Sequence, residues 1–357
     1  MARCFNFNAG PATLPLEVLQ EAQADLVDFK GSGMSIMEHS HRGKEYDAVH
    51  SEAIANFKKL LNLGDNYEVL FVAGGASMQF AMVPMNLLGP GQTADYIHSG
   101  AWAGKAVAEA KLIGSVNVAA NTGKDIPTHM PALADLRLTP GAAYVHLTSN
   151  ETIAGSQWKT FPKTDAPLVA DMSSDILSRP FDSSRFALIY AGAQKNLGPS
   201  GLALVAIRKD LADRAPEKLP SMLKYKTYVD EKSLYNTPPC FGIYIMMLVS
   251  RWILKQGAEK LYSRNAEKAA KIYSAIDAGF YKGTAVKEYR SDMNITFRLP
   301  TEALEEQFVK EAAKLGMKGL KGHRSVGGIR ASVYNAFPME GVDALVSFMR
   351  DFAKKNG

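Results

Sequence analysis

The sequence predicts an α/β protein with a mostly parallel central sheet covered by helices on both faces, followed by a smaller C-terminal α+β region. Near-continuous apolar runs recur with helical or loop segments between them, which is typical of strands buried on both faces. The chain has 357 residues, which is too long for one simple core and indicates two domains. In the last third the sequence pattern changes: long amphipathic segments predominate, with two isolated strand-like runs.

Seven apolar runs are expected to form the strands of one sheet. They cover residues 67–74, 93–100, 115–121, 142–150, 166–174, 186–195 and 202–209. Only the segment NLGPSG separates the last two runs, and it is too short for a parallel crossover. These two strands are therefore expected to be antiparallel neighbours.

Helices are expected where apolar residues recur with a helical period, at 15–29, 44–62, 302–315 and 341–355. Pro15 suits the start of the first helix. In the final third, MNITFRLP (293–300) and GIRASVY (328–334) are predicted strands. The predicted large domain covers residues 16–255, and the small domain combines residues 1–15 with 256–357.

Composition narrows the class of protein. No run of about 18 apolar residues exists, and the N-terminal segment lacks the apolar region of a signal peptide, so neither a membrane span nor secretion is expected. Cys4 and Cys240 cannot form a disulfide framework, which favours the cytoplasm. The net charge of +5 is spread along the chain, so small anionic ligands are expected rather than nucleic acid, and no metal site is expected.

Lys195 and Asp171 follow two successive predicted strands. In open α/β sheets, ligands bind at the carboxyl ends of the strands, so an amine and a carboxylate are expected to converge there. A buried carboxylate needs a partner, because an unpaired one is energetically costly. Taken alone, Asp171 could cap a helix and Lys195 could begin a surface loop.

Further candidate groups follow other strands. Small residues, Gly74-Gly75 and then Ala76-Ser77, lie between a strand and a helix, where backbone N–H groups and the helix dipole favour a phosphate. Trp102 could stack on a flat ring, and Thr152 offers a hydroxyl. Singly, these residues fit a structural turn or a core position. Together they indicate pyridoxal phosphate, with Lys195 forming the Schiff base and Asp171 pairing with the ring nitrogen.

The chain resembles the phosphoserine aminotransferases, a class V family of the fold-type I pyridoxal-phosphate enzymes. The resemblance runs from NFNAGPATLP to ALVSFM and is carried by AGAQKNLGPSG, ADMSSDILSRP, SHRGKEY, SNETIAG, YNTPPCFGIY and KGHRSVGGIRASVYNA. It implies amino transfer between L-glutamate and 3-phosphohydroxypyruvate, giving O-phospho-L-serine and 2-oxoglutarate in serine biosynthesis. It leaves open whether the phosphorylated four-carbon acid of vitamin B6 synthesis is also a substrate.

The resemblance also implies roles for individual residues. Lys195 would carry the cofactor, and the residues that hold it would be Ala76, Ser77, Trp102, Thr152, Asp171 and Gln194. Asn236 and Thr237 would reach the cofactor phosphate of the partner subunit in a homodimer with shared sites. Some family members carry Gly-Arg where this chain has Ala76-Ser77, so a phosphate contact from an arginine side chain is not expected at this position.

Two His-Arg pairs and a separate arginine supply more positive charge than one carboxylate needs. His41-Arg42 lies in EHSHRGKEY, and His323-Arg324 and Arg330 lie in KGHRSVGGIRAS. Arginine binds carboxylates and phosphates with two parallel hydrogen bonds, and a phosphate monoester carries nearly two charges. The resemblance implies that Arg330 binds the α-carboxylate and that both His-Arg pairs bind the phosphate or side-chain carboxylate.

Other classes of protein account less well for the same residues. Another class V enzyme, such as a small-amino-acid aminotransferase or a cysteine desulfurase, would share the fold, but a desulfurase needs a mobile nucleophilic cysteine. Cys4 lies near the N-terminus and Cys240 follows two prolines, so neither is well placed. A non-catalytic anion-binding protein would not explain Lys195 with Asp171, and a nicotinamide dehydrogenase would carry GxGxxG after an early strand.

Overall fold

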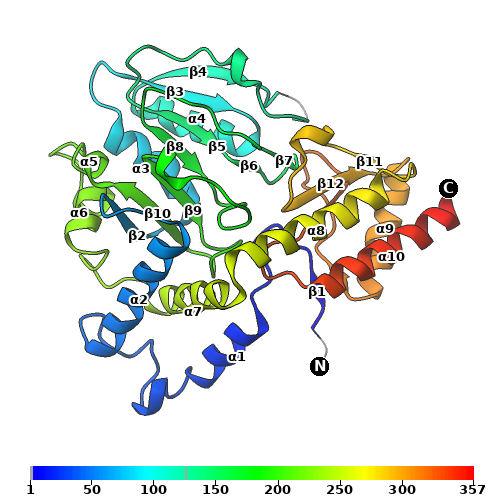
Figure 1. The fold of residues 1–357 in the computed structure, drawn as a ribbon, viewed down its shortest axis with the longest axis horizontal. Coiled ribbons are helices and arrows are strands. Elements are labelled where there is room, and N and C mark those ends of the chain that lie inside the picture. The colour runs from blue at the N-terminus through cyan, green and yellow to red at the C-terminus, as the bar shows by residue number, and fades with distance from the viewer. Residues whose placement is uncertain (1–2, 125–126) are drawn as a thin grey trace.

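A seven-stranded sheet forms the centre of the larger part of the fold in this computed structural model, which describes residues 3–124 and 127–357 (Figure 1). The strand order is β2-β10-β9-β8-β5-β3-β4. The strands are β2 (Tyr67–Ala73), β3 (Thr93–His98), β4 (Ser115–Asn121), β5 (Val145–Thr148), β8 (Leu168–Asp171), β9 (Leu188–Gly192) and β10 (Leu202–Arg208). β10 runs antiparallel to both β9 and β2, and the other neighbouring pairs are parallel. The seven predicted strands and the antiparallel pair are confirmed.

Helices cover both faces of this sheet, as the near-continuous apolar runs predict. Along β10, Leu204 and Ala206 face one apolar core while Val205 and Ile207 face the other. The first core is completed by α2 (Lys44–Leu60) and α7 (Cys240–Gln256), and the second by α3 (Gly75–Leu87) and α4 (Ala101–Ile113). Successive strand residues point to opposite faces, so a strand between two helix layers must be apolar throughout.

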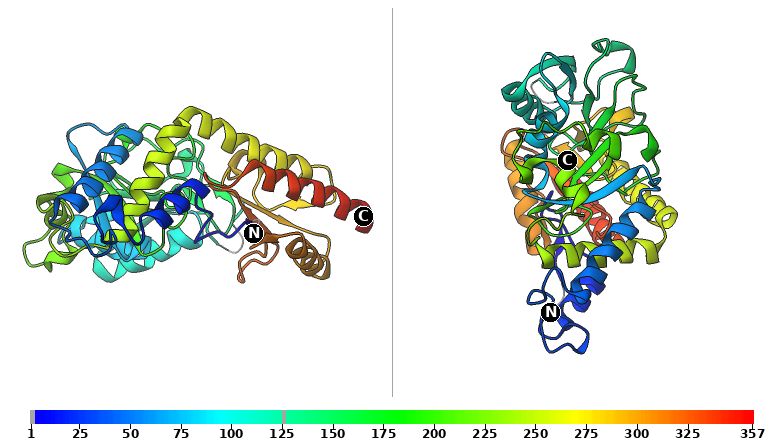
Figure 2. Two further views of the ribbon diagram at one scale, coloured as in Figure 1. Left: turned by 90° about the horizontal axis from the view of Figure 1, so that it is seen from below. Right: turned by 90° about the vertical axis from the view of Figure 1, so that its left-hand side faces the viewer.

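The C-terminal third forms a smaller α+β region at one end of the long axis (Figure 2). Its antiparallel sheet has the order β11-β12-β14, and its main elements are α8 (Ala258–Ile276), β11 (Lys282–Gly283), β12 (Asn294–Arg298), α9 (Glu302–Lys314), β14 (Ile329–Ser332) and α10 (Met339–Asn356). The N-terminal β1 (Phe5–Asn6) pairs with β13 (Met317–Lys318), and Phe7 belongs to the core of this region. The division into residues 16–255 and residues 1–15 with 256–357 stays a prediction, which this pairing supports.

Several elements are shorter than the sequence predicts. α1 (Leu16–Ala24) ends before the predicted residue 29, and the segment that follows it turns through Gly31 and Gly33, both at positive φ. The run 142–150 divides into β5 and the short β6 (Asn150–Glu151), which pairs with β7 (Ser156–Gln157).

Short helical segments connect the main elements. They are α5 (Lys209–Ala212), α6 (Tyr225–Asp230) and 3₁₀ turns at Phe29–Gly31, Leu133–Asp135, Ser183–Arg185, Ser221–Leu223 and Lys287–Tyr289. In the described part of the chain, no helix combines the length and the apolar character needed to cross a membrane.

Candidate active site

A cavity of about 290 Å³ opens at the carboxyl edge of the large sheet. β2, β3, β5, β8 and β9 all run in the same direction, so the segments that follow them meet at this edge. The cavity is lined by Gly10, Pro11, Gly74, Gly75, Ala76, Ser77, Phe80, Trp102, Thr148, Asn150, Thr152, Asp171, Ser173, Ser174, Gln194, Lys195, Ser200 and Gly201. Seven residues predicted to hold the cofactor are among them.

Lys195 lies in the turn between β9 and β10 and points its amine into the cavity. Its Nζ donates a hydrogen bond to Thr152 Oγ1 at 2.7 Å and lies 5.6 Å from the centre of the Trp102 ring. Burial lowers the pKa of the Lys195 ammonium to about 8, and the nearby Asp171 carboxylate opposes this shift. Near physiological pH a larger share of this lysine is therefore neutral than of an ordinary exposed lysine, and the neutral amine is the form that a nucleophile or general base requires.

Asp171 ends β8, next to β9, and is buried with 4% exposure. One of its oxygens accepts hydrogen bonds from the backbone N–H of Ser173 at 2.9 Å and from the Ser173 hydroxyl at 2.5 Å. Burial raises the pKa of Asp171, while these two bonds and the charge of Lys195 lower it. The arrangement suits a carboxylate that holds a cationic ring nitrogen.

The N-terminus of α3 forms one wall of the cavity. Gly74 and Gly75 both have positive φ, and Ala76 and Ser77 follow in the first helical turn. A Cβ on Gly74 would lie 2.8 Å from Met78 Cβ, so this tight turn requires glycine. Free backbone N–H groups at a helix N-terminus attract a phosphate, and the Ser77 hydroxyl adds a donor.

Unpartnered polar atoms test whether a ring-shaped cofactor fits. Thr148 Oγ1 and Trp102 Nε1 are buried and have no hydrogen-bond partner among the described residues, and both residues line the cavity. A buried polar group without a partner is costly, so a bound molecule that supplies polar atoms would stabilise this wall. The donors, the indole ring, the amine and the helix N-terminus together fit pyridoxal phosphate.

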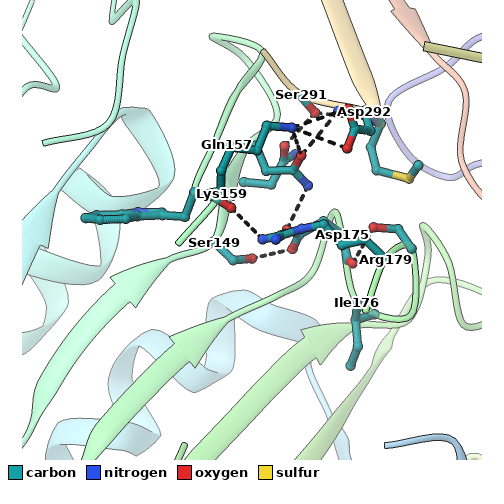
Figure 3. Close-up of polar contacts among 12 residues, drawn as sticks. Ser149, Gln157, Lys159, Asp175, Ile176, Arg179, Ser291 and Asp292 are labelled. Atoms are coloured by element: carbon teal, nitrogen blue, oxygen red, sulfur yellow. Dashed lines mark hydrogen bonds and ion pairs between the residues drawn. The ribbon is translucent and has the colours of Figure 1, made fainter. Parts of the chain in front are cut away.

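A polar network braces the turn that follows β8 (Figure 3). Asp175 accepts hydrogen bonds from the Ser149 hydroxyl and from Gln157 Nε2, the latter at 3.0 Å. Gln157 Oε1 in turn accepts from Lys159 Nζ at 2.9 Å and from the backbone N–H of Asp292 at 3.3 Å. The network joins the turn after Asp171 to the segment that enters β12, so it links the large sheet to the smaller region.

Comparison with known proteins points to one family. The sequence profile of the family described as Aminotransferase class-V matches residues 4–345. The phosphoserine aminotransferase of Desulfosudis oleivorans is 57% identical over 360 residues, covering 99% of both chains. The chain belongs to the phosphoserine aminotransferases, within the class V aminotransferase family.

Solved structures of phosphoserine aminotransferases share the fold. The enzyme from Bacillus circulans subsp. alkalophilus superposes with a TM-score of 0.97 at 57% identity and covers 99% of each chain. The structure of the pyridoxal-phosphate-bound enzyme from Trichomonas vaginalis superposes with a TM-score of 0.93 at 40% identity, covering 98% of this chain and 100% of that one. These matches confirm the predicted fold class of a pyridoxal-phosphate-dependent transferase with a mostly parallel sheet.

The residues predicted to bind substrate in this phosphoserine aminotransferase family member are only partly gathered. His323 and Arg330 line a second cavity of about 260 Å³, and Arg330 Nη1 donates to the Thr152 carbonyl at 3.4 Å, so Arg330 adjoins the Lys195 site. Arg324 is exposed on the same loop. In the described chain, His41 and Arg42 line neither cavity, and neither do Asn236 and Thr237, which are predicted to reach the cofactor phosphate of a partner subunit.

Sequence reasoning missed several residues at the site of this family member. Thr148, Asn150, Ser173 and Ser174 line the cavity from the segments that end β5 and β8. The polar residues that end the runs AAYVHLTSN and APLVADMSS were a signal for them, because ligands bind at the carboxyl ends of the strands in sheets of this kind. Gly10 and Pro11 carried no such signal, since they reach the cavity from the N-terminal segment, far from Lys195 in the sequence.

Removing the charge of Asp171 is expected to lower the pKa of Lys195 below about 8, because the carboxylate stabilises the ammonium form. The pKa can be measured for cofactor-free Asp171→Asn from the pH dependence of Lys195 acylation, quantified by mass spectrometry. Asp213→Asn, at an exposed position, serves as the control and should leave the value unchanged. An unchanged or raised Lys195 pKa in Asp171→Asn would contradict the electrostatic coupling.

Proposed function

We propose that this protein is a pyridoxal-phosphate-dependent aminotransferase that moves the amino group between L-glutamate and 3-phosphohydroxypyruvate, forming O-phospho-L-serine and 2-oxoglutarate. The observation that carries the proposal is the placement of Lys195, Asp171 and Thr152 in one buried cavity of a chain that is 57% identical to phosphoserine aminotransferases. Serine biosynthesis follows from the product.

Pyridoxal 5′-phosphate, the cofactor of this family, supplies an electron-withdrawing ring that stabilises negative charge at the substrate Cα. Lys195 would attach the cofactor, and Asp171 would hold its ring nitrogen. The N-terminal turn of α3 would bind its phosphate through Ala76 and Ser77. The remaining contacts would come from Trp102, Thr152 and Gln194, which line the same cavity.

Lys195 is suited to move the proton at the substrate Cα. Its pKa of about 8 allows the amine to accept a proton and to return it, since a general acid–base group works best near the operating pH. Thr152 accepts a hydrogen bond from Nζ and so fixes the direction of the amine. Asp171 keeps a negative charge close to the reacting centre.

The cationic residues support a dianionic substrate. Arg330 adjoins Thr152 and would bind the α-carboxylate, and His323 with Arg324 would bind the phosphate of one substrate or the side-chain carboxylate of glutamate. Burial lowers the pKa of His323, and the nearby positive charges of Arg330 and Arg324 lower it further, so positive charge is concentrated around this histidine. His41 and Arg42 would join this cluster in the assembled enzyme.

We also propose a homodimer with shared active sites, working in the cytoplasm. Large apolar side chains lie exposed on the segment before His41, namely Leu16, Leu19, Leu26, Val27, Met34 and Met37. Tyr235 is also exposed, directly before Asn236 and Thr237. Exposed apolar patches of this kind favour a partner, and a second copy would cover them while bringing Asn236 and Thr237 to the neighbouring cavity.

A cysteine desulfurase is the weaker proposal. Cys240 begins α7 outside both cavities, and burial raises the pKa of its thiol, which makes it a poorer nucleophile. Cys4 is exposed near the start of the chain. A small-amino-acid aminotransferase would share Lys195 and Asp171. It would differ from a phosphoserine aminotransferase in that it would not prefer substrates with a second anionic group.

Purified protein loaded with pyridoxal phosphate should form glutamate from phosphoserine and 2-oxoglutarate. Lys195→Ala is expected to reduce this rate by about 10³-fold or more, because attachment of the cofactor and the proton transfer both depend on the amine. Coupled detection of glutamate gives the rates. Lys218→Ala, at an exposed position, is the control. Near-normal turnover by Lys195→Ala would rule out the assigned role.

Arg324→Ala is expected to lower kcat/KM for phosphoserine by about tenfold to a hundredfold, since a charge-assisted hydrogen bond contributes about 1.5–3 kcal/mol. Activity toward alanine should change little, because alanine has no second anionic group. Steady-state kinetics with both substrates, and with the exposed Arg350→Ala as control, measure the difference. Equal losses for both substrates would remove Arg324 from the recognition set.

The shared-site proposal can be tested by mixing two inactive variants. Lys195→Ala and the double variant Asn236→Ala, Thr237→Ala are combined under conditions that allow subunit exchange. In a mixed dimer one site carries both lesions and the other carries neither, so activity should partly return. Mixed dimers that form, as shown by native mass spectrometry, and remain inactive would show that the loop serves its own subunit.

A further inference from the structure

We propose that Glu151 is a positioning residue: its buried carboxylate holds the first turn of α4 and thereby fixes Trp102 against the cavity. The proposal rests on the proposed function, because the orientation of Trp102 matters there for binding the cofactor ring. Glu151 itself does not line the cavity and has no role in the chemistry described above.

The hydrogen bonds of the Glu151 side chain all reach the start of α4 or the residue Ser99 just before it. Oε2 accepts from the backbone N–H of Trp102 at 3.2 Å, and Oε1 accepts from the backbone N–H of Ala103 at 3.1 Å and from the Ser99 hydroxyl at 3.2 Å. The first N–H groups of a helix have no partner within the helix, and a carboxylate there also interacts favourably with the helix dipole. Glu151 therefore caps α4 from a different element, β6.

The local cap that most helices use is missing here. The N-cap residue is Gly100, which has no side chain to accept these hydrogen bonds. A Cβ at Gly100 would lie 2.5 Å from Glu151 Cδ, so the carboxylate occupies the space that a capping side chain would need. The pair Gly100 and Glu151 thus replaces a local cap by a long-range one.

As a means of stabilising α4, the long-range Glu151 cap is less favourable than a local cap would be. Glu151 is fully buried, its three hydrogen-bond donors are neutral, and burial raises its pKa to about 7. Burying a charge costs free energy that a serine or asparagine at the N-cap would avoid. What the long-range cap adds is a rigid connection between Trp102 and the strand segment that carries Thr152.

The neighbouring residue completes this connection. Thr152 directly follows Glu151 and accepts the hydrogen bond from Lys195 Nζ at 2.7 Å. One short segment therefore sets the direction of the lysine amine through Thr152 and the position of the indole through Glu151. Trp102 lies 5.6 Å from Lys195 Nζ, so both groups would face the same bound ring.

Glu151→Gln removes one acceptor and places an amide N–H₂ opposite a backbone N–H. The first turn of α4 is then expected to loosen, so that Trp102 becomes mobile and the Kd for pyridoxal phosphate rises by about tenfold or more. Glu109→Gln, the same change at an exposed position of α4, is the matched control and should alter neither property.

The first measurement uses cofactor-free protein with fluorotryptophan at its three tryptophans, followed by ¹⁹F NMR. In Glu151→Gln the Trp102 resonance should shift or broaden, while those of Trp158 and Trp252 stay unchanged. An unchanged Trp102 resonance overturns the proposal, whatever the enzyme's activity. If Glu151→Gln does not fold, Ser99→Ala takes its place, because it removes only one of the three donors. Ser99→Ala must then shift or broaden the Trp102 resonance alone, by a smaller amount.

The second measurement is a double-mutant cycle on the Kd of pyridoxal phosphate. If Glu151 acts through Trp102, Glu151→Gln should raise the Kd in the native background and add little in a Trp102→Phe background. Additive losses overturn the proposal while leaving the aminotransferase function intact. Failure of the native protein to bind pyridoxal phosphate would instead overturn the proposed function, and the ¹⁹F result would still decide whether Glu151 positions Trp102.

Discussion

The site depends on keeping one amine and one carboxylate buried together at the carboxyl edge of a sheet. Burial lowers the pKa of Lys195 and raises that of Asp171, and the attraction between the two groups opposes both shifts. The charge of Lys195 and the Ser173 hydrogen bonds favour the anionic form of Asp171, and the pKa of Lys195 lies close enough to physiological pH for its amine to change charge. A sheet edge suits this purpose, because neighbouring strand ends bring the two groups close without a flexible loop.

The groups around this pair are fixed by backbone as much as by side chains. Asp171 is held by Ser173, Lys195 by Thr152, and the turn after β8 by Asp175 and its partners. The Ser173 contact lies within the segment that ends β8, while the Lys195–Thr152 and Gln157–Asp175 contacts join segments of different strands. These contacts hold the polar groups in place without a ligand, and such preorganisation reduces the conformational entropy lost on binding.

The two parts of the fold meet around the same segment. Asn150 Nδ2 donates to Asn294 Oδ1 at 2.8 Å, and the Thr296 hydroxyl donates to the Ala154 carbonyl at 2.8 Å. Residues 150–154 therefore touch the smaller region on one side and the Lys195 site on the other. This explains how Arg330, on β14, comes to lie beside Thr152.

The sequence by itself determined the strands of the large sheet and the antiparallel β9–β10 pair, because both follow from local apolar runs and loop length. It also identified Lys195 and Asp171, since a charged residue at the end of a buried strand is unusual. The domain boundary and the roles of all the predicted site residues, Lys195 and Asp171 included, stay predictions.

Only the tertiary structure decided which polar groups work together. Glu151 caps a helix that begins about fifty residues earlier in the chain, and Gly10 reaches Lys195 from the N-terminus. Local periodicity carries no information about such pairs, because it reports only which face of an element is buried. Their contact depends on the strand order, which is set by the packing of the whole sheet.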